Sequence, residues 1–144
     1  MNKKYEPLRL ENQLCFPLYA CSREIIKKYR PFLEELDLTY TQYIAMIVLW
    51  EYRSISVKEI GKKLYLDSGT LTPVLKSLEA KGLLTRHRSK TDERVLLAEI
   101  TEKGDTLRDK ALSVPQKLCG CIALSKEETE SLRTILNKIL SCAE

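Results

Sequence analysis

The most reactive side chains in this chain are its five cysteines: Cys15, Cys21, Cys119, Cys121 and Cys142. An odd number of cysteines, in a chain whose basic start lacks an apolar export segment, argues against a framework of structural disulfides. The zinc interpretation is weak, because Cys119 and Cys121 are separated by one residue and His87 is the only histidine. We predict no metal and no other cofactor. Redox chemistry or inert burial remains open for each thiol.

A second group of polar residues indicates nucleic-acid binding. Between residues 56 and 94 the pattern predicts two short helices followed by a hairpin. Ser56 and Glu59 form a capping box for the first helix. Asp67 caps the second helix, and Gly82 ends it. Both helices are too short to be stable alone, so they must pack against a larger unit.

The outward face of the second helix has the composition of a DNA-reading surface. With Leu71, Leu75 and Leu78 turned inward, that face carries no carboxylate. Small hydroxyl side chains and one lysine suit a helix in a DNA major groove, where they bond base edges or phosphates. Pro73 is expected to bend the helix without ending it. The predicted DNA contacts from this helix are Ser68, Thr70, Thr72, Pro73 and Lys76.

The hairpin after this helix concentrates the positive charge. Residues 83–88 and 95–100 have strand character, and residues 81–94 hold five Lys or Arg against two acids, about +3 of the net +4 of the chain. Charge runs are most often solvated faces, but a basic ribbon beside a carboxylate-free helix is typical of a winged helix-turn-helix. Arg94 has a competing role, because pairing with Asp92 would stiffen the wing. The predicted contacts from the wing are Arg86, Ser89, Lys90 and Arg94.

Amphipathic helices flank this unit on both sides. The pattern predicts a helix over residues 10–36 with bends near Pro17 and Pro31, an apolar helix over 41–52, a helix over 101–119 kinked at Pro115, and a last helix capped by Ser125. These helices have more apolar surface than one small core consumes, which favours a homodimer. We predict a mainly α single domain over 1–144 with a small β-hairpin wing, in which 41–100 bind DNA and 8–36 and 101–144 form the dimer interface.

Composition is consistent with this class. The 144 residues are 44% hydrophobic and 31% charged, and a net charge of +4 suits a nucleic-acid partner. The longest apolar run, Tyr43 to Trp50, is far shorter than a membrane span. We expect a cytoplasmic protein with no membrane partner.

Three stretches resemble a known family. Asp92-Glu93-Arg94-Val95-Leu96-Leu97 running to Ile100-Thr101-Glu102-Lys103-Gly104 is similar to the wing and exit of MarR-family dimeric winged-helix regulators. Leu10-Glu11-Asn12-Gln13-Leu14-Cys15-Phe16 and Leu64-Tyr65-Leu66-Asp67-Ser68-Gly69-Thr70-Leu71-Thr72-Pro73 resemble the organic-hydroperoxide-resistance repressor (OhrR) branch. The resemblance covers nearly the whole chain and is weakest after Lys110.

The resemblance implies a thiol sensor. In that branch a cysteine near the start of the first helix, here Cys15, is held by tyrosine hydroxyls, some from the partner subunit, and the matching tyrosines are Tyr19, Tyr29 and Tyr40. Organic hydroperoxide would oxidise the Cys15 thiolate to a sulfenic acid and then to a disulfide. The resolving thiol would be Cys119 or Cys121 of the partner, with Cys21 and Cys142 as bystanders.

Oxidation would alter the spacing of the two recognition helices in the dimer. They must match half-sites of a pseudo-palindromic operator about 34 Å apart, so double-stranded DNA would be released. One alternative is a MarR-type repressor regulated by a small aromatic ligand in the dimer cleft, with Cys15 incidental. A broader thiol-based redox regulator is another. A thiol peroxidase is disfavoured, because no base such as histidine is expected near Cys15.

Overall fold

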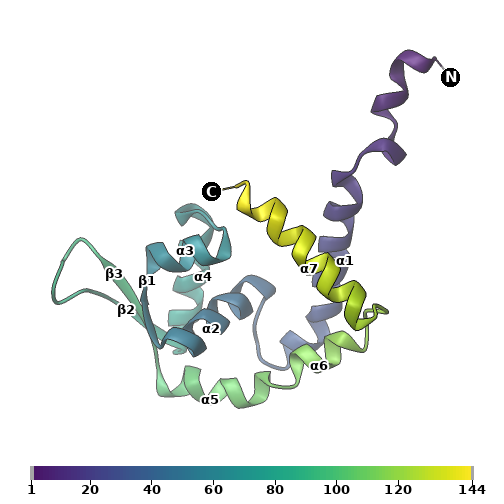
Figure 1. Ribbon diagram of the computed structural model, residues 1–144. Coiled ribbons are helices and arrows are strands. Elements are labelled where there is room, and N and C mark those ends of the chain that lie inside the picture. Colours follow the sequence, from purple (N-terminus) through teal and green to yellow (C-terminus); the bar gives the residue numbers. More distant parts are fainter. Residues whose placement is uncertain (1, 144) are drawn as a thin grey trace.

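The computed structural model describes residues 2–143 and confirms the mainly helical class with a small β wing (Figure 1). Two short 3-10 helices, η1 (Lys3–Leu8) and η2 (Leu10–Asn12), open the chain. The elements that follow are α1 (Cys15–Glu34), α2 (Tyr40–Tyr52), β1 (Ser54–Ser56), α3 (Val57–Leu64), α4 (Ser68–Ala80), β2 (Leu84–Arg88), β3 (Leu96–Ile100), α5 (Glu102–Ala111), α6 (Val114–Cys119) and α7 (Lys126–Ser141).

The helix-turn-helix forms where the sequence predicts it. The Ser56 hydroxyl accepts the Glu59 N–H at 3.1 Å, and the Asp67 carboxylate accepts the Thr70 N–H at 2.8 Å. The predicted Ser56 capping box is only half formed. The Glu59 carboxylate does not bond the Ser56 backbone N–H and lies 3.7 Å from Lys62 Nζ instead. Gly61 permits the tight turn, since a Cβ there would lie 2.9 Å from the carbonyl oxygen of Leu66.

The wing is a three-stranded antiparallel sheet in the order β1-β3-β2. The hairpin β2-β3 was predicted, whereas β1 was not, because three residues carry too little periodicity to indicate a strand. Ala98 of β3 pairs with Ile55 of β1 and with Arg86 of β2, and it is fully buried. β1 therefore anchors the base of the wing to the helix-turn-helix.

Helix α2 forms the centre of the core. Ala45, Met46 and Leu49 have no exposed surface, and they lie in one cluster with Leu75 and Leu78 of α4. Pro73 lies inside α4 without ending it, as predicted. The recognition helix is thus fixed by its inner leucines, which leaves its opposite face available for a partner.

Two predicted helices differ from the structure. α1 begins at Cys15 rather than near residue 10, so Pro17 falls in its first turn, where a missing N–H breaks no helical bond. The predicted helix over 101–119 is divided into α5 and α6, with Pro115 in the first turn of α6. The Pro115 ring removes a donor and excludes the carbonyl four residues earlier, so the expected kink is a break.

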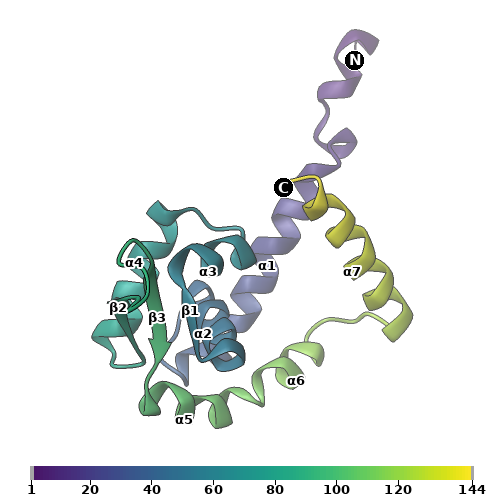
Figure 2. The same ribbon diagram turned by 60° about the vertical axis from the view of Figure 1, so that its left-hand side comes forward.

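The two ends of the chain extend from the winged unit. Figures 1 and 2 show η1, η2 and the start of α1 projecting outward, and Figure 2 shows α7 standing clear of the other helices. Both segments carry exposed apolar side chains, namely Leu8, Leu10, Leu14, Phe16, Leu18, Leu132, Ile135 and Ile139. Within residues 2–143, no helix is both long and apolar enough to cross a membrane.

Candidate thiol site and nucleic-acid interface

Cys15 is the first residue of α1, and its side chain is exposed. The backbone N–H groups of a first helical turn have no partner within the helix, so the positive end of the helix dipole lies at this thiol. The first turn contains no acidic side chain that would oppose a negative charge. Cys15 is therefore an accessible thiol at the helix end to which an anionic group is attracted.

Tyr19 lies one helical turn after Cys15 and is also exposed. Its hydroxyl accepts a hydrogen bond from Arg23 Nη1 at 3.3 Å, and the Arg23 guanidinium lies 5.5 Å from the centre of the tyrosine ring. Arg23 was missed by sequence reasoning, although the four-residue spacing from Tyr19 places both side chains on one face. This face of α1 therefore carries a phenol about one turn, and a cation about two turns, after Cys15.

Tyr29 and Tyr40 do not lie near Cys15 of the same chain. Tyr29 is 14 residues further along α1, which at 1.5 Å per residue is about 21 Å away. Its ring lies 4.9 Å from the ring of Tyr40 and 5.9 Å from that of Tyr43, a third tyrosine that sequence reasoning did not select. The predicted site residues thus form two groups: Cys15 and Tyr19 near the start of α1, and Tyr29 with Tyr40 of α2 near its end.

The tyrosines of this cluster are held in their neutral form. Burial raises the pKa of Tyr29 to about 12, and the nearby ionisable side chains of Tyr40, Tyr43 and Cys119 act in the same direction. Burial also raises the pKa of Tyr40 and of Tyr43. At neutral pH all three phenols are therefore hydrogen-bond donors.

The two candidate resolving cysteines lie in different surroundings. Cys119 ends α6, which packs against α1, and its proximity contributes to the raised pKa of Tyr29. Cys121 follows in the next turn, and its thiol donates to the Lys117 carbonyl oxygen at 3.4 Å. Cys119 therefore belongs to the tyrosine cluster, and Cys121 is turned back onto its own helix.

The outward face of α4 is exposed as the sequence predicts. Asp67 caps the N-terminus of α4, and the residues that follow it project from the unit. The first turn of α4 contains no acidic residue. Of the predicted DNA contacts, Ser68, Thr70, Pro73 and Lys76 are exposed and Thr72 is half-buried. The face has the size and composition needed to enter a major groove.

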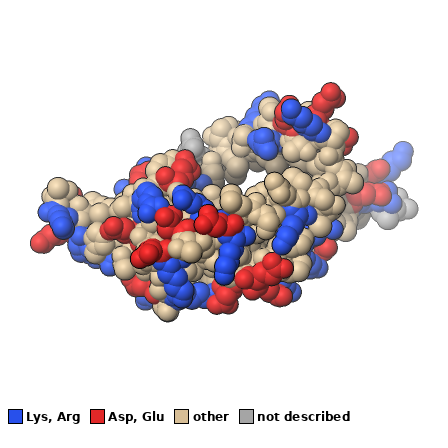
Figure 3. All heavy atoms as spheres, turned by 90° about the horizontal axis from the view of Figure 1, so that it is seen from below, with Lys and Arg blue, Asp and Glu red and all other residues tan. Residues whose placement is uncertain are grey.

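The wing tip presents both free and paired charges. In Figure 3 the wing is the protrusion at the left, with basic and acidic atoms at its end. Arg94 makes two contacts to Asp92, Nε to Oδ1 at 3.1 Å and Nη2 to Oδ2 at 3.3 Å, and hydrogen bonds from Arg94 lower the pKa of Asp92. Ser89 bonds Thr91 across the tip at 3.0 Å, which leaves Lys90 exposed beside it.

Arg86 differs from the other predicted wing contacts because Glu79 holds it. Glu79 Oε2 accepts the Arg86 backbone N–H at 2.8 Å, and Glu79 Oε1 accepts Arg86 Nη2 at 3.1 Å. The Arg86 side chain is 18% exposed. This pair joins the last turns of α4 to β2 and fixes the angle between recognition helix and wing.

Replacing Lys90 with alanine should weaken binding to every DNA sequence alike, because a lysine at the tip can contact phosphate without reading a base. We expect the slope of log K against log salt to become shallower by about 0.9. Fluorescence anisotropy over a salt series measures this slope. Lys126→Ala, which removes an equal charge from α7, should leave the slope unchanged, and an unchanged slope for Lys90→Ala would refute the phosphate contact.

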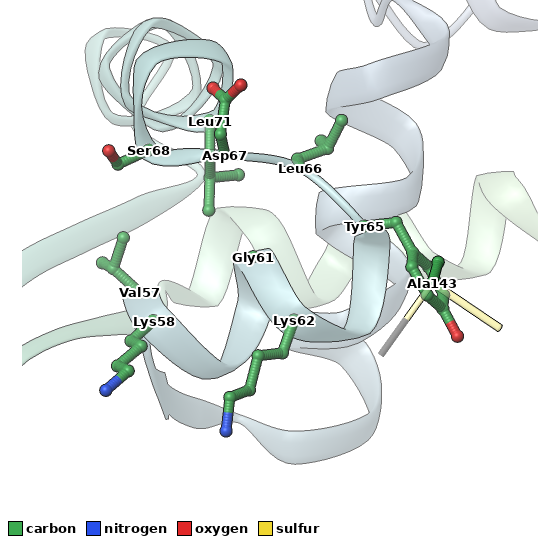
Figure 4. Close-up of a pocket in the computed structure, with 10 residues that line it drawn as sticks. All are labelled: Val57, Lys58, Gly61, Lys62, Tyr65, Leu66, Asp67, Ser68, Leu71 and Ala143. Atoms are coloured by element: carbon green, nitrogen blue, oxygen red, sulfur yellow. The ribbon is translucent and has the colours of Figure 1, made fainter. Parts of the chain in front are cut away.

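A hollow of about 1070 Å³ lies between α3, the start of α4 and the end of α7. Figure 4 shows Tyr65 of the turn beside Ala143, with Gly61 and Leu66 to their left, while Lys58 and Lys62 extend away. None of the residues lining this hollow belongs to the thiol site. It is a separate feature of the DNA-binding unit.

Several known proteins are similar to this chain. Residues 25–111 match the family described as transcriptional regulator SarA/Rot. The chain is 48% identical to the organic hydroperoxide resistance transcriptional regulator of Bacillus subtilis, over 97% of this chain and 95% of that protein. The chain belongs to the MarR family of winged-helix transcriptional regulators. Within this family it falls in the organic-hydroperoxide-resistance branch.

Solved structures of a related MarR-family regulator include more than one redox state. The chain is 32% identical to reduced AbfR bound to DNA, with a TM-score of 0.79 over 97% of this chain and 96% of that one. Against disulfide-formed AbfR the identity is 34% and the TM-score is 0.65, over 96% and 98% of the two chains. AbfR is a protein of Staphylococcus epidermidis. Like its MarR-family relatives, this chain is a DNA-binding transcriptional regulator and not an enzyme.

Proposed function

We propose that this MarR-family protein is a homodimeric repressor that releases its operator when an organic hydroperoxide oxidises Cys15. One observation carries the proposal: Cys15 lies at one end of α1, whereas Tyr29, Tyr40 and Cys119 gather at the other. A two-fold axis near the middle of α1 places the start of one helix beside the end of its copy. Each Cys15 then meets the phenols and the Cys119 thiol of the partner.

The oxidation is chemically balanced. The Cys15 thiolate attacks one oxygen of the hydroperoxide O–O bond, the bond breaks, and the alkoxide takes a proton and leaves as an alcohol. Cys15 is then a sulfenic acid. The partner's Cys119 attacks its sulfur as a thiolate, a disulfide forms, and the hydroxyl leaves as water with one proton. Phenol O–H groups stabilise the thiolate at the start and the departing alkoxide during the first step.

Apolar surroundings favour an organic oxidant. Phe16 and Leu18 are exposed next to Cys15. Phe16 and Pro17 also line a hollow of about 680 Å³ together with Leu10. Burial of a hydrocarbon group against these side chains contributes roughly 25 cal/mol per Å², a gain that hydrogen peroxide cannot make.

Exposed apolar surface supports the dimer. Leu14 is 85% exposed and Ile135 is 57% exposed, and such side chains follow the start of α1 and one side of α7. Contiguous apolar surface of this kind marks a contact between subunits. We assign the interface to residues 8–36 and 101–144, and DNA binding to residues 41–100.

The test uses a duplex enriched from random sequence by the reduced wild-type protein. Cumene hydroperoxide should release this duplex, and a thiol reductant should restore binding. Intact-mass analysis of the same sample under non-reducing conditions should show a covalent dimer that has lost two hydrogens per disulfide. Retention of the duplex after complete oxidation of Cys15 would refute the proposed function.

The two candidate resolving thiols give opposite predictions. Cys119→Ser should abolish the covalent dimer, because Cys119 lies at the tyrosine cluster that Cys15 of the partner approaches. Cys121→Ser should form the covalent dimer as the wild type does, since its thiol points to Lys117. Non-reducing electrophoresis after hydroperoxide treatment measures both. The reverse result would move the resolving role to Cys121.

A further inference from the structure

Gln42 is the one polar or charged residue that is buried among residues 2–143, with 8% of its surface exposed. It lies in the first turn of α2, where it completes a capping box with Thr39 that sequence reasoning did not recognise. Burying an amide costs free energy unless its polar atoms are bonded. The contacts of Gln42 therefore explain its position.

The Gln42 amide joins α2 to the end of the recognition helix. Its Nε2 donates to Ser77 Oγ at 2.9 Å, and its Oε1 accepts the Lys81 Nζ at 3.2 Å. The same Oε1 accepts the Thr39 backbone N–H at 3.0 Å. Lys81 Nζ also donates to the Asp37 carbonyl oxygen in the turn between α1 and α2. One side chain thus connects the α1–α2 turn with the last turn of α4.

The same turn of α2 carries part of the thiol site. Tyr40 precedes Gln42 by two residues, and its ring lies 4.9 Å from that of Tyr29. Tyr43 follows Gln42 directly, and its ring lies 5.9 Å from Tyr29. Gln42 and the tyrosines that contact Tyr29 therefore share one turn of backbone.

We propose that Gln42, through its hydrogen bonds to Ser77 and Lys81, is the positioning residue that couples the oxidation state of the thiol site to the orientation of the recognition helix. This inference rests on the proposed function. Apolar contacts between α2 and α4 tolerate small sliding movements, whereas a hydrogen bond weakens steeply when its distance or angle is distorted. A displacement of the first turn of α2 is therefore transmitted to the end of α4 through these hydrogen bonds.

A merely structural role for Gln42 would lower stability without changing the response to oxidation. The quantity that separates the two roles is the ratio of DNA dissociation constants, oxidised over reduced. This ratio measures the coupling between the thiol site and DNA, and a uniform loss of stability or affinity cancels from it. Denaturant unfolding of the reduced proteins gives the stability separately.

The experiment compares the wild type with Gln42→Leu, which keeps the volume and loses all side-chain bonds, and Ser77→Ala, a milder change that removes the acceptor on α4. Trp50→Phe is the matched control. It removes the hydrogen bond from Trp50 Nε1 to the Gly104 carbonyl oxygen, 2.8 Å, which joins the same helix α2 to α5 instead of α4. Dissociation constants are measured with the enriched duplex before and after cumene hydroperoxide.

We expect the ratio to fall by about tenfold for Gln42→Leu and several-fold for Ser77→Ala, within the usual range of coupling between sites. Trp50→Phe should keep the wild-type ratio. An unchanged ratio for both α2–α4 variants, or an equal fall for Trp50→Phe, would overturn the inference while leaving the proposed function intact. If the wild type itself kept its DNA after oxidation, both would be overturned.

Discussion

Replacing Cys15 with serine is expected to leave DNA binding by the reduced protein intact and to abolish its release by cumene hydroperoxide. Serine has nearly the same size, but its hydroxyl is not ionised at neutral pH and does not attack a peroxide. The residue lies at the exposed start of α1, away from α4 and the wing, so the substitution disturbs neither the core nor the DNA face.

The expected difference is large. After cumene hydroperoxide, the affinity of the wild type for the duplex should fall by roughly 10- to 100-fold, within the range of typical allosteric coupling. The affinity of Cys15→Ser should change by less than about twofold, because the coupled thiol is absent. Fluorescence anisotropy with the enriched duplex measures both.

Cys21→Ser and Cys142→Ser are the matched controls, because both thiols are exposed and neither belongs to the thiol site. They should respond as the wild type does. Full release by Cys15→Ser would instead indicate control by another thiol or by a ligand, and the broader redox or the aromatic-ligand interpretation would take its place.

Replacing Gly104 with alanine should destabilise the fold more than other single-methyl additions. Gly104 is buried in the first turn of α5, where a Cβ would lie 2.1 Å from the Leu83 carbonyl oxygen and 2.9 Å from a side-chain carbon of Ile100. Its N–H donates to Thr101 Oγ1, and its carbonyl accepts the Trp50 indole N–H. Because the obstacle is backbone, we expect a loss of about 3 kcal/mol in the free energy of unfolding.

Gly69→Ala provides a control for the added methyl group. A Cβ at Gly69 would approach only the Asp67 carboxylate, at 3.4 Å. In an exposed first turn, alanine should stabilise the helix by about 0.5 kcal/mol. Urea unfolding at equal protomer concentration measures both variants, since the stability of a dimer depends on concentration. Equal effects of the two substitutions would show that α5 can move away from Leu83.

The helix α4 and its exposed face, which we propose binds DNA, could be predicted from the sequence because their signals are local. Asp67 caps α4 through an N–H three residues away, and the inward leucines of α4 recur at helical spacing. Arg94 and Asp92 pair across two residues. Each of these contacts closes within a turn or two of chain, so residue type and spacing suffice to indicate it.

The thiol site could be predicted only in part. The resemblance named Cys15, Tyr19, Tyr29 and Tyr40, but it did not show that Cys15 and Tyr29 lie about 21 Å apart along α1, with Tyr40 of α2 beside Tyr29. It also left Cys119 and Cys121 equivalent. Their difference depends on which thiol faces α1, and the packing of α6 decides this.

The class of the protein, the helix-turn-helix with its wing, and the polar face of α4 follow from residue type and spacing, because hydrophobic period, capping residues and charge act over a few residues. The roles of Gln42, Glu79 and Gly104 follow from the packing of the helices instead. Gln42 bonds residues 35 and 39 positions away, and a Cβ at Gly104 would collide with the backbone of Leu83. Such contacts depend on how α2, α4 and α5 pack together, and the spacing of residues along the chain does not show which side chains this packing brings into contact.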